Sequence, residues 1–99
     1  MSEIKLKNPQ ELALMRQSGR LLAQVFAYLD LHIKAGLSTM QVNDLTERYI
    51  VDQLASRPAS KGQYGFKYVL NSSVNHVVCH GVPSETQMLK AGDIVNIDI

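Results

Sequence analysis

A long amphipathic helix near the start of the chain constrains the possible folds most strongly. Asn8, Pro9 and Glu11 supply a capping side chain, a proline at the first helical position and a glutamate three residues after the cap, so a helix should begin at Pro9. The apolar positions that follow, with Gly19 in the one gap, are Leu12, Met15, Leu22, Phe26, Leu29 and Ile33. This spacing predicts a face buried along its whole length, with another backbone close to Gly19, and an end at Ala35 and Gly36. Such a helix is about 38 Å long, whereas a compact chain of this size is about 33 Å across, so the helix fits a larger body.

The rest of the chain predicts a second helix and then short strands. Ser38 and Gln41 form a capping box ahead of an apolar pattern that runs to Leu54, which predicts another amphipathic helix. Residues 56–62 are small or turn-forming and predict a loop. Segments that favour β-structure follow at residues 68–70, 74–80 and 94–99. The sequence therefore predicts an α/β (α+β) fold of two amphipathic helices and then antiparallel strands, with residues 1–99 as one unit.

The composition is that of an ordinary globular protein. Of the 99 residues, 45% are hydrophobic and 19% are charged, and the net charge is +1. This balance gives no electrostatic reason to expect nucleic acid or a membrane surface as a partner. No apolar run approaches the roughly 20 residues that span a bilayer, and the first residues lack the apolar stretch of a signal peptide. The single cysteine, Cys79, cannot form an internal disulfide, so we expect a cytoplasmic protein.

His76 and His80 are four residues apart, a spacing with which two histidines on a helix can share a metal ion. The residues between them favour an extended segment, however, in which the two side chains would lie about 13 Å apart. A metal site formed by this pair alone is therefore disfavoured, and either histidine alone is more typical of a surface or a satisfied core position. Cys79, on the opposite face, is most simply a small buried hydrophobe.

Asp98 lies in the final strand pattern, between Ile97 and Ile99, where it should be mostly buried. An ionised carboxylate there is costly unless it is paired, hydrogen-bonded or bound to a cation. Two interpretations stay open: a strand-end aspartate that meets water or backbone donors, and a metal ligand. One carboxylate does not make a metal site, because such sites need roughly four to six ligands. The pattern also stops without a turn or a tail, so we expect the chain to be the front part of something longer.

Two motifs at a fixed separation identify a resemblance. Asn75 precedes the run VVCHGVP at residues 77–83, and the run LKAGDIVNID follows at residues 89–98. Together they resemble the first half of a bacterial-type (type I) methionine aminopeptidase. The segments that resemble that family's opening helices are 9–20, 36–39 and 49–51.

The resemblance implies the pita-bread fold, in which two pseudo-symmetric halves enclose two divalent metal ions, which could be Co, Mn, Fe, Zn or Ni. The family removes the initiator methionine from nascent polypeptides when the second residue is small, by attack of a metal-activated water on the scissile carbonyl. The implied partners are nascent peptides and, as a further candidate, the ribosome, with no membrane, no direct nucleic-acid binding and a monomeric state.

The same resemblance implies roles for particular residues. His80 matches the histidine that hydrogen-bonds near the scissile amide, and Asp98 matches the first metal-binding aspartate. The pocket for the methionine side chain would draw on residues 63–66 and Asn71, with Tyr64, Phe66 and Asn71 as the substrate-binding residues. Members of the family usually carry tyrosine, cysteine or similar residues at these pocket positions, and a glutamate where this chain has His76.

The family's other metal ligands lie beyond residue 99. We therefore expect that the isolated chain neither binds two ions tightly nor cleaves Met-peptides. The alternative is a truncated non-catalytic paralogue or an interaction module of the same fold, and the coding sequence past Ile99 would distinguish these. A proline-directed peptidase of the same fold is a weaker option, because the motif at residues 77–83 argues against it.

Overall fold

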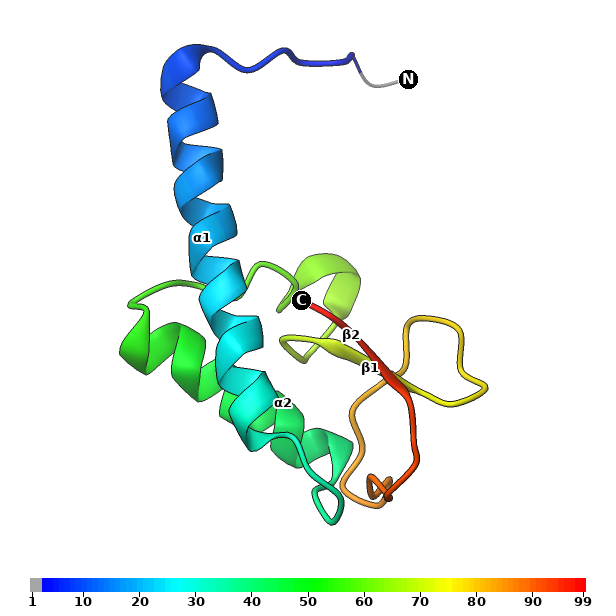
Figure 1. Cartoon of the computed structure of the whole chain (residues 1–99). Helices are drawn as coiled ribbons and strands as arrows, with labels where there is room; N and C mark the ends of the chain where they lie inside the picture. The colour runs from blue at the N-terminus through cyan, green and yellow to red at the C-terminus, as the bar shows by residue number, and fades with distance from the viewer. Residues whose placement is uncertain (1–2) are drawn as a thin grey trace.

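The computed structural model describes residues 3–99, in which the helices come first and a strand pair comes last (Figure 1). The elements in chain order are α1 (Pro9–His32), α2 (Thr39–Arg48), the π-helix η1 (Tyr49–Gln53), the short 3-10 helix η2 (Gln63–Gly65), β1 (Asn71–Val74) and β2 (Val95–Asp98). The two strands pair antiparallel. This order confirms the predicted α+β class.

Both helix starts form as the sequence predicts. Asn8 Oδ1 accepts a hydrogen bond from the Glu11 N–H at 2.8 Å, and Glu11 Oε1 accepts one from the Asn8 N–H at 3.0 Å. Ser38 and Gln41 exchange the same two bonds at the start of α2, at 3.0 and 2.8 Å. Each box satisfies backbone donors that the first turn of a helix leaves without a partner.

The end of α1 comes earlier than predicted. The helix stops at His32, so the expectation that it runs to Ala35 and Gly36 was wrong. The reason lies far away in the sequence: the Gly36 N–H donates to the Leu89 carbonyl at 2.8 Å, and the Leu89 N–H donates to the Leu37 carbonyl at 2.8 Å. To make this pairing, the chain leaves the helix at Ile33, which is extended, and turns at Ala35 and Gly36, where the φ of Gly36 is 96°.

The apolar face of α1 is buried only at its C-terminal end. Val25 and Leu29 are each 2% exposed. The stripe residues that remain exposed are Leu12 (40%), Met15 (57%), Leu22 (37%) and Phe26 (41%). A Cβ added at Gly19 would meet nothing within 4 Å among the described residues. The predictions of a wholly buried stripe and of a close backbone at Gly19 were therefore wrong. The other elements, α2 and η1, cover only the C-terminal half of α1.

The shape of the molecule also shows that the N-terminal half of α1 is uncovered. The N-terminal half of α1 stands clear of the body that the other elements form (Figure 1). The radius of gyration is 15.1 Å, whereas a compact domain of this length has about 13 Å. Neither α1 nor any other helix of residues 3–99 combines the length and the apolar character needed to cross a bilayer.

A buried asparagine connects α2 to the core. Asn43 is 3% exposed, and its Oδ1 accepts a hydrogen bond at 2.9 Å from the N–H of Val69, which is fully buried. No other acceptor for this N–H is recorded within residues 3–99. Removing the amide would therefore leave a buried backbone donor without a partner.

We expect Asn43→Ala to lower the free energy of unfolding by about 1–3 kcal/mol, the usual cost of orphaning a buried donor. Urea titration followed by circular dichroism measures this. Asn96→Ala is the matched control, because Asn96 is exposed on β2 and its loss should change stability by less than about 0.5 kcal/mol. Equal midpoints for the Asn43 variant and the wild type would contradict the role of this hydrogen bond.

The strand pair has one face on the core and one face open to the site. The register pairs are Asn71–Asp98, Ser72–Ile97, Ser73–Asn96 and Val74–Val95. Val74 belongs to the buried core, and Val95 and Ile97 pack against it. Because residues paired across an antiparallel ladder share a face, Asn71, Ser73 and Asp98 lie on the opposite face.

Two of the three predicted strands do not form. Residues 68–70 lie outside any strand, and β1 begins after them at Asn71, so the expectation for that segment was wrong. Residues 74–80 were expected to be extended, but the chain turns at Asn75, whose φ is 53°. Its N–H donates to the Ile94 carbonyl at 2.9 Å, and the Val77 N–H closes a turn onto the Val74 carbonyl at 3.1 Å. An asparagine tolerates this left-handed conformation better than most residues, and it ends the ladder despite the β-branched residues that follow.

Candidate functional site

An open cavity of about 730 Å³ lies between residues 59–66 and the start of β1. It brings together the four residues predicted for substrate binding and catalysis outside the metal ligand, which are Tyr64, Phe66, Asn71 and His80. Gln63, which the sequence also placed at the pocket, lies in its wall as well. A cavity of this size is within the range of small-molecule sites. The roles of these residues stay predictions, but their convergence is a property of the fold.

The loop around η2 forms one wall of the cavity. Gly62 has a φ of 91°, and its N–H donates to the Phe66 carbonyl at 2.7 Å, which closes the loop. Phe66 is half-buried, and its ring packs edge-on against Tyr68 with centroids 5.6 Å apart. Tyr64 is fully exposed and has a φ of 51°. Phe66 therefore offers a fixed apolar surface, while Tyr64 stands at the rim.

Asn71 connects the cavity to Asp98. It is the first residue of β1, and the strand register places it directly opposite Asp98 on the same face. Asp98 does not line the cavity, and it is exposed, so the expectation of a mostly buried carboxylate was wrong. The alternation of β2 turns Ile97 toward the core and Asp98 away from it.

The described part of the chain does not contain a complete metal site. Within residues 3–99, no three His, Cys, Asp or Glu side chains lie close enough together to hold an ion. Asp98 can give one carboxylate, which is an oxygen ligand that divalent ions accept. One such group does not fit a two-metal centre by itself.

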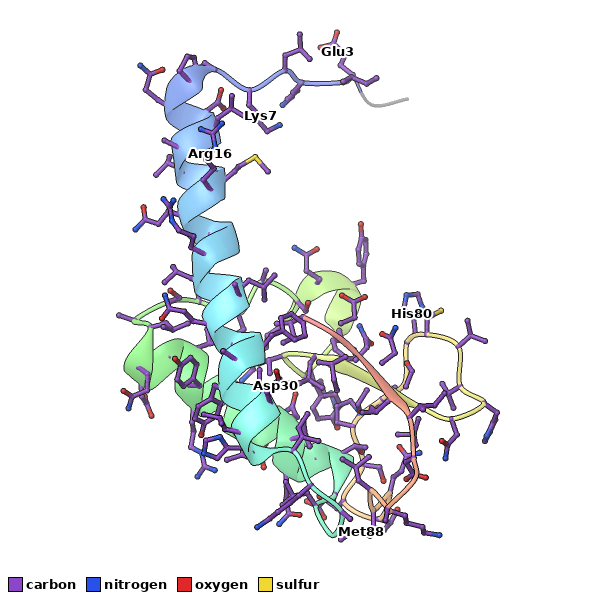
Figure 2. The ribbon with its side chains drawn as sticks, viewed as in Figure 1. Glu3, Lys7, Arg16, Asp30, His80 and Met88 are labelled. Atoms are coloured by element: carbon purple, nitrogen blue, oxygen red, sulfur yellow. The ribbon has the colours of Figure 1, made fainter. Side chains whose placement is uncertain are left out.

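His80 lies on a loop that leaves the end of β1 and returns beside it. Figure 2 shows His80 on the side of this loop that faces η2. Its φ of 58° is a conformation that side-chain-bearing residues rarely adopt. His76 lies in the turn at the start of the loop, so the strand geometry from which its distance to His80 was predicted does not occur. Cys79 is exposed, and the prediction of a buried hydrophobe was wrong because a loop has no inward face there.

Gly81 holds the returning end of this loop against β1. Its carbonyl accepts from the Ser72 N–H at 2.8 Å, and its own N–H donates to Ser73 Oγ at 3.0 Å. A Cβ at this position would lie 2.1 Å from the Ser72 carbonyl oxygen. The sequence analysis did not single out Ser73 and Gly81, which hold the loop that carries His80 against β1. The available signal was a glycine directly after a β-favouring run, since a glycine beside a strand often marks a close backbone approach.

A carboxylate and two amide groups close the turn before β2. Asn75 donates to Asp93 Oδ1 at 2.9 Å, the Lys90 N–H donates to Asp93 Oδ2 at 2.8 Å, and the Ile94 N–H donates to Asn75 Oδ1 at 3.1 Å. The bonds from Asn75 and then from Lys90 lower the pKa of the Asp93 carboxyl below its ordinary value. This network fixes where β2 begins, and therefore which residue of β1 faces Asp98.

The sign of the pKa shift predicts a dependence of stability on acid. A carboxylate whose pKa is lower in the folded state stabilises the fold above its unfolded pKa of about 3.9, and this is lost as the pH falls through the folded value. We expect the melting temperature to fall below about pH 4, and Asp93→Asn to reduce that dependence and to lower stability at neutral pH. Thermal melts between neutral and strongly acidic pH measure both effects. Asp30→Asn, on α1, is the control that should keep the wild-type profile, and an unchanged profile for Asp93→Asn would contradict the assignment.

Comparison with known proteins identifies the family. The family model for metallopeptidase family M24 matches residues 13–99. The chain belongs to metallopeptidase family M24. Among curated M24 relatives, the methionine aminopeptidase of Escherichia coli (strain K12) is 38% identical over 96 residues, which cover 97% of this chain and 36% of that protein. The methionine aminopeptidase of Buchnera aphidicola subsp. Acyrthosiphon pisum (strain APS) is 42% identical over 94 residues, which cover 95% and 36%.

Solved M24 structures show the same likeness in three dimensions. Methionine aminopeptidase from Rickettsia prowazekii superposes with a TM-score of 0.90 and 38% identity, over 97% of this chain and 38% of that one. Methionine aminopeptidase from Thermotoga maritima superposes with a TM-score of 0.88 and 34% sequence identity, over 96% of this chain and 38% of that one. The predicted resemblance and the pita-bread fold are confirmed, and the chain spans just over a third of the length of the relatives it matches.

Proposed function

We propose that this chain supplies the substrate-binding side of a methionine aminopeptidase site, which hydrolyses the bond after an N-terminal methionine. The observation that carries the proposal is the single cavity that joins Phe66, Asn71 and His80, with Asp98 next to Asn71 across the strand pair. The 38% identity to methionine aminopeptidases over 97% of the chain supports it.

Each cavity residue has a role that its surroundings permit. Phe66 offers an apolar wall for the methionine side chain, and thioethers pack favourably on aromatic rings. Tyr64 at the rim and Asn71 at the strand end would contact the remainder of the first residue. His80 would donate a hydrogen bond near the scissile amide, where charge develops during the reaction.

The metal requirement exceeds what these residues provide. In the proposed enzyme Asp98 would be one of the metal ligands, with Co, Mn, Fe, Zn and Ni as candidate ions, and two bound ions would supply an activated water. The other donors must come from outside residues 3–99, since no group of three His, Cys, Asp or Glu side chains within them could hold an ion. We therefore assign to this chain substrate binding, one metal ligand and one hydrogen-bond donor, and we expect the isolated chain to be inactive.

The proposed partners follow from the proposed activity. Nascent polypeptides with an N-terminal methionine and a small second residue are the substrates, the ribosome is a further partner, and the protein acts as a monomer in the cytoplasm. A net charge of +1 and the absence of a bilayer-crossing helix among residues 3–99 agree with this and do not require it.

A second candidate, a non-catalytic interaction module, is favoured by the exposed apolar stripe of α1. A surface of this kind binds a partner whether or not chemistry follows. The two candidates differ in one measurable respect. Only the catalytic proposal predicts that methionine is released once the missing metal ligands are supplied.

The test of the catalytic proposal is a chimera in which this chain replaces the 96-residue matched segment of the Escherichia coli enzyme. We expect the chimera to release methionine from Met-Gly-type peptides in the presence of Mn²⁺ or Co²⁺. His80→Ala in the chimera should lower kcat about 100-fold and leave KM nearly unchanged, because a donor aimed at developing charge acts mainly on the transition state.

His76→Ala is the matched control for that variant, because His76 is exposed on the same loop and does not line the cavity. It should retain full activity. A folded, metal-loaded chimera that releases no methionine would favour the interaction module, and full activity of the His80→Ala chimera would contradict the role assigned to His80.

A further inference from the structure

The backbone of His80 is in a conformation that needs support. Its φ of 58° is unfavourable for a residue with a side chain, so it persists only where neighbouring contacts hold it. The residues before it belong to a loop with exposed side chains at His76, Val78 and Cys79. Within residues 3–99, the hydrogen bonds recorded next to His80 are those of the residue that follows, Gly81.

Gly81 is held at two points by β1. The Ser72 N–H bonds its carbonyl at 2.8 Å, and Ser73 Oγ accepts from its N–H at 3.0 Å. The second contact is the only recorded bond from a side chain to this backbone within residues 3–99. Ser73 is 3% exposed, so water does not readily replace its hydroxyl. The peptide that this bond fixes is the one that joins His80 to Gly81.

We propose that Ser73 is a positioning residue, which fixes the direction of the His80 imidazole over the cavity by holding the N–H of Gly81. This rests on the function proposed above for His80. Without the hydroxyl, the peptide between His80 and Gly81 can rotate about the Cα–C bond of His80, so the backbone that carries the imidazole is held less firmly in its left-handed conformation. The imidazole then points at the cavity for only part of the time, which lowers the rate of a step that depends on its position.

The neighbouring residue offers a matched control. Ser72 is 1% exposed, and its Oγ is buried with no hydrogen-bond partner among residues 3–99. Ser72→Ala and Ser73→Ala thus each remove one buried hydroxyl from adjacent positions of β1, and only the second breaks a bond to Gly81. If the loss of any buried hydroxyl of β1 lowered kcat, the two variants would lose similar activity. A loss confined to Ser73→Ala would point to its bond with Gly81.

Two measurements test the proposal. In the 99-residue chain, hydrogen exchange measured by NMR should show the Gly81 amide exchanging about tenfold faster in Ser73→Ala, and unchanged in Ser72→Ala. In the chimera, Ser73→Ala should lower kcat about tenfold with KM nearly unchanged, Ser72→Ala should keep kcat, and Ser73→Thr, which retains an Oγ, should restore most of the rate.

The outcomes distinguish a failure of the positioning role of Ser73 from a failure of the proposed function. If His80→Ala lowers kcat as predicted and Ser73→Ala keeps either its Gly81 protection or its kcat, the positioning role is wrong and the proposed function stands. An equal loss of kcat in the Ser72→Ala and Ser73→Ala chimeras would also overturn it. If His80→Ala is fully active, the proposed role of His80 fails, and the positioning role fails with it.

Discussion

Gly81→Ala is expected to lower the free energy of unfolding of the 99-residue chain by about 3 kcal/mol, at the upper end of the usual cost of overpacking. The new Cβ would lie 2.1 Å from the Ser72 carbonyl oxygen and 2.9 Å from the Ser73 Cα, and both are backbone atoms of a paired strand. Neither can move without loosening the ladder between β1 and β2. The variant should therefore also lose the bond from the Ser72 N–H to residue 81.

Gly19→Ala is the matched control, and its predicted effect has the opposite sign. Gly19 lies inside α1 with nothing within 4 Å of an added Cβ among the described residues, so alanine should stabilise the chain by up to about 1 kcal/mol. Urea midpoints of the two variants measured under one condition test both claims. A Gly81→Ala protein as stable as the wild type would contradict the close approach on which the placement of His80 depends.

Asp98→Asn in the chimera is expected to weaken uptake of the metal ions by at least about 100-fold and to abolish release of methionine. Loss of a residue that only supports a metal ligand already lowers metal affinity by about 10–100-fold, and loss of a direct ligand should lower it by no less. An amide also lacks the negative charge that offsets that of the ions. The backbone pairing with Asn71 does not depend on this side chain, so the strand pair should remain.

Competition titration with Co²⁺, followed by visible absorption, measures this loss of affinity. Glu85→Gln is the control, because it removes one negative charge from an exposed position outside the strand pair and the cavity. It should bind the ions as the parent chimera does. Unchanged affinity in the Asp98→Asn chimera would show that this carboxylate is a strand-end residue that meets only water.

The parts of the fold that depend on neighbouring residues were predictable from the sequence. The capping boxes at Asn8 and Ser38 need only residues three positions away, so both helix starts were located correctly. The end of α1 depends on Leu89, which lies more than fifty residues along the chain from Gly36. Helical periodicity carries no information about such a pairing.

The strands illustrate a conflict between propensity and tertiary contact. Residues 77 and 78 are both valine, which favours β-structure, but Asn75 closes the ladder and bonds Asp93 before they are reached. The burial of Cys79 and Asp98 was predicted wrongly for a related reason. Both predictions assumed that an apolar run is a strand with a covered face on each side, whereas the loop that carries Cys79 and the outer face of β2 are open.

The candidate site was predicted from motifs, and the roles of its residues stay predictions. The run at residues 77–83 pointed to His80 and the resemblance pointed to Phe66 and Asn71, and the fold brings the three to one cavity. Ser73 could not be found in this way, because its part in the site depends on a hydrogen bond to a backbone eight residues away.

Release of methionine from a Met-Gly-type peptide, with Mn²⁺ or Co²⁺ added, tests most directly whether this chain carries one side of an aminopeptidase site. We expect turnover by the chimera and none by the 99-residue chain at equal concentration, because the chain offers Asp98 but, among residues 3–99, no group of three His, Cys, Asp or Glu side chains that could hold an ion. Turnover by the chain alone, or a silent chimera that is folded and loaded with metal, would contradict the account.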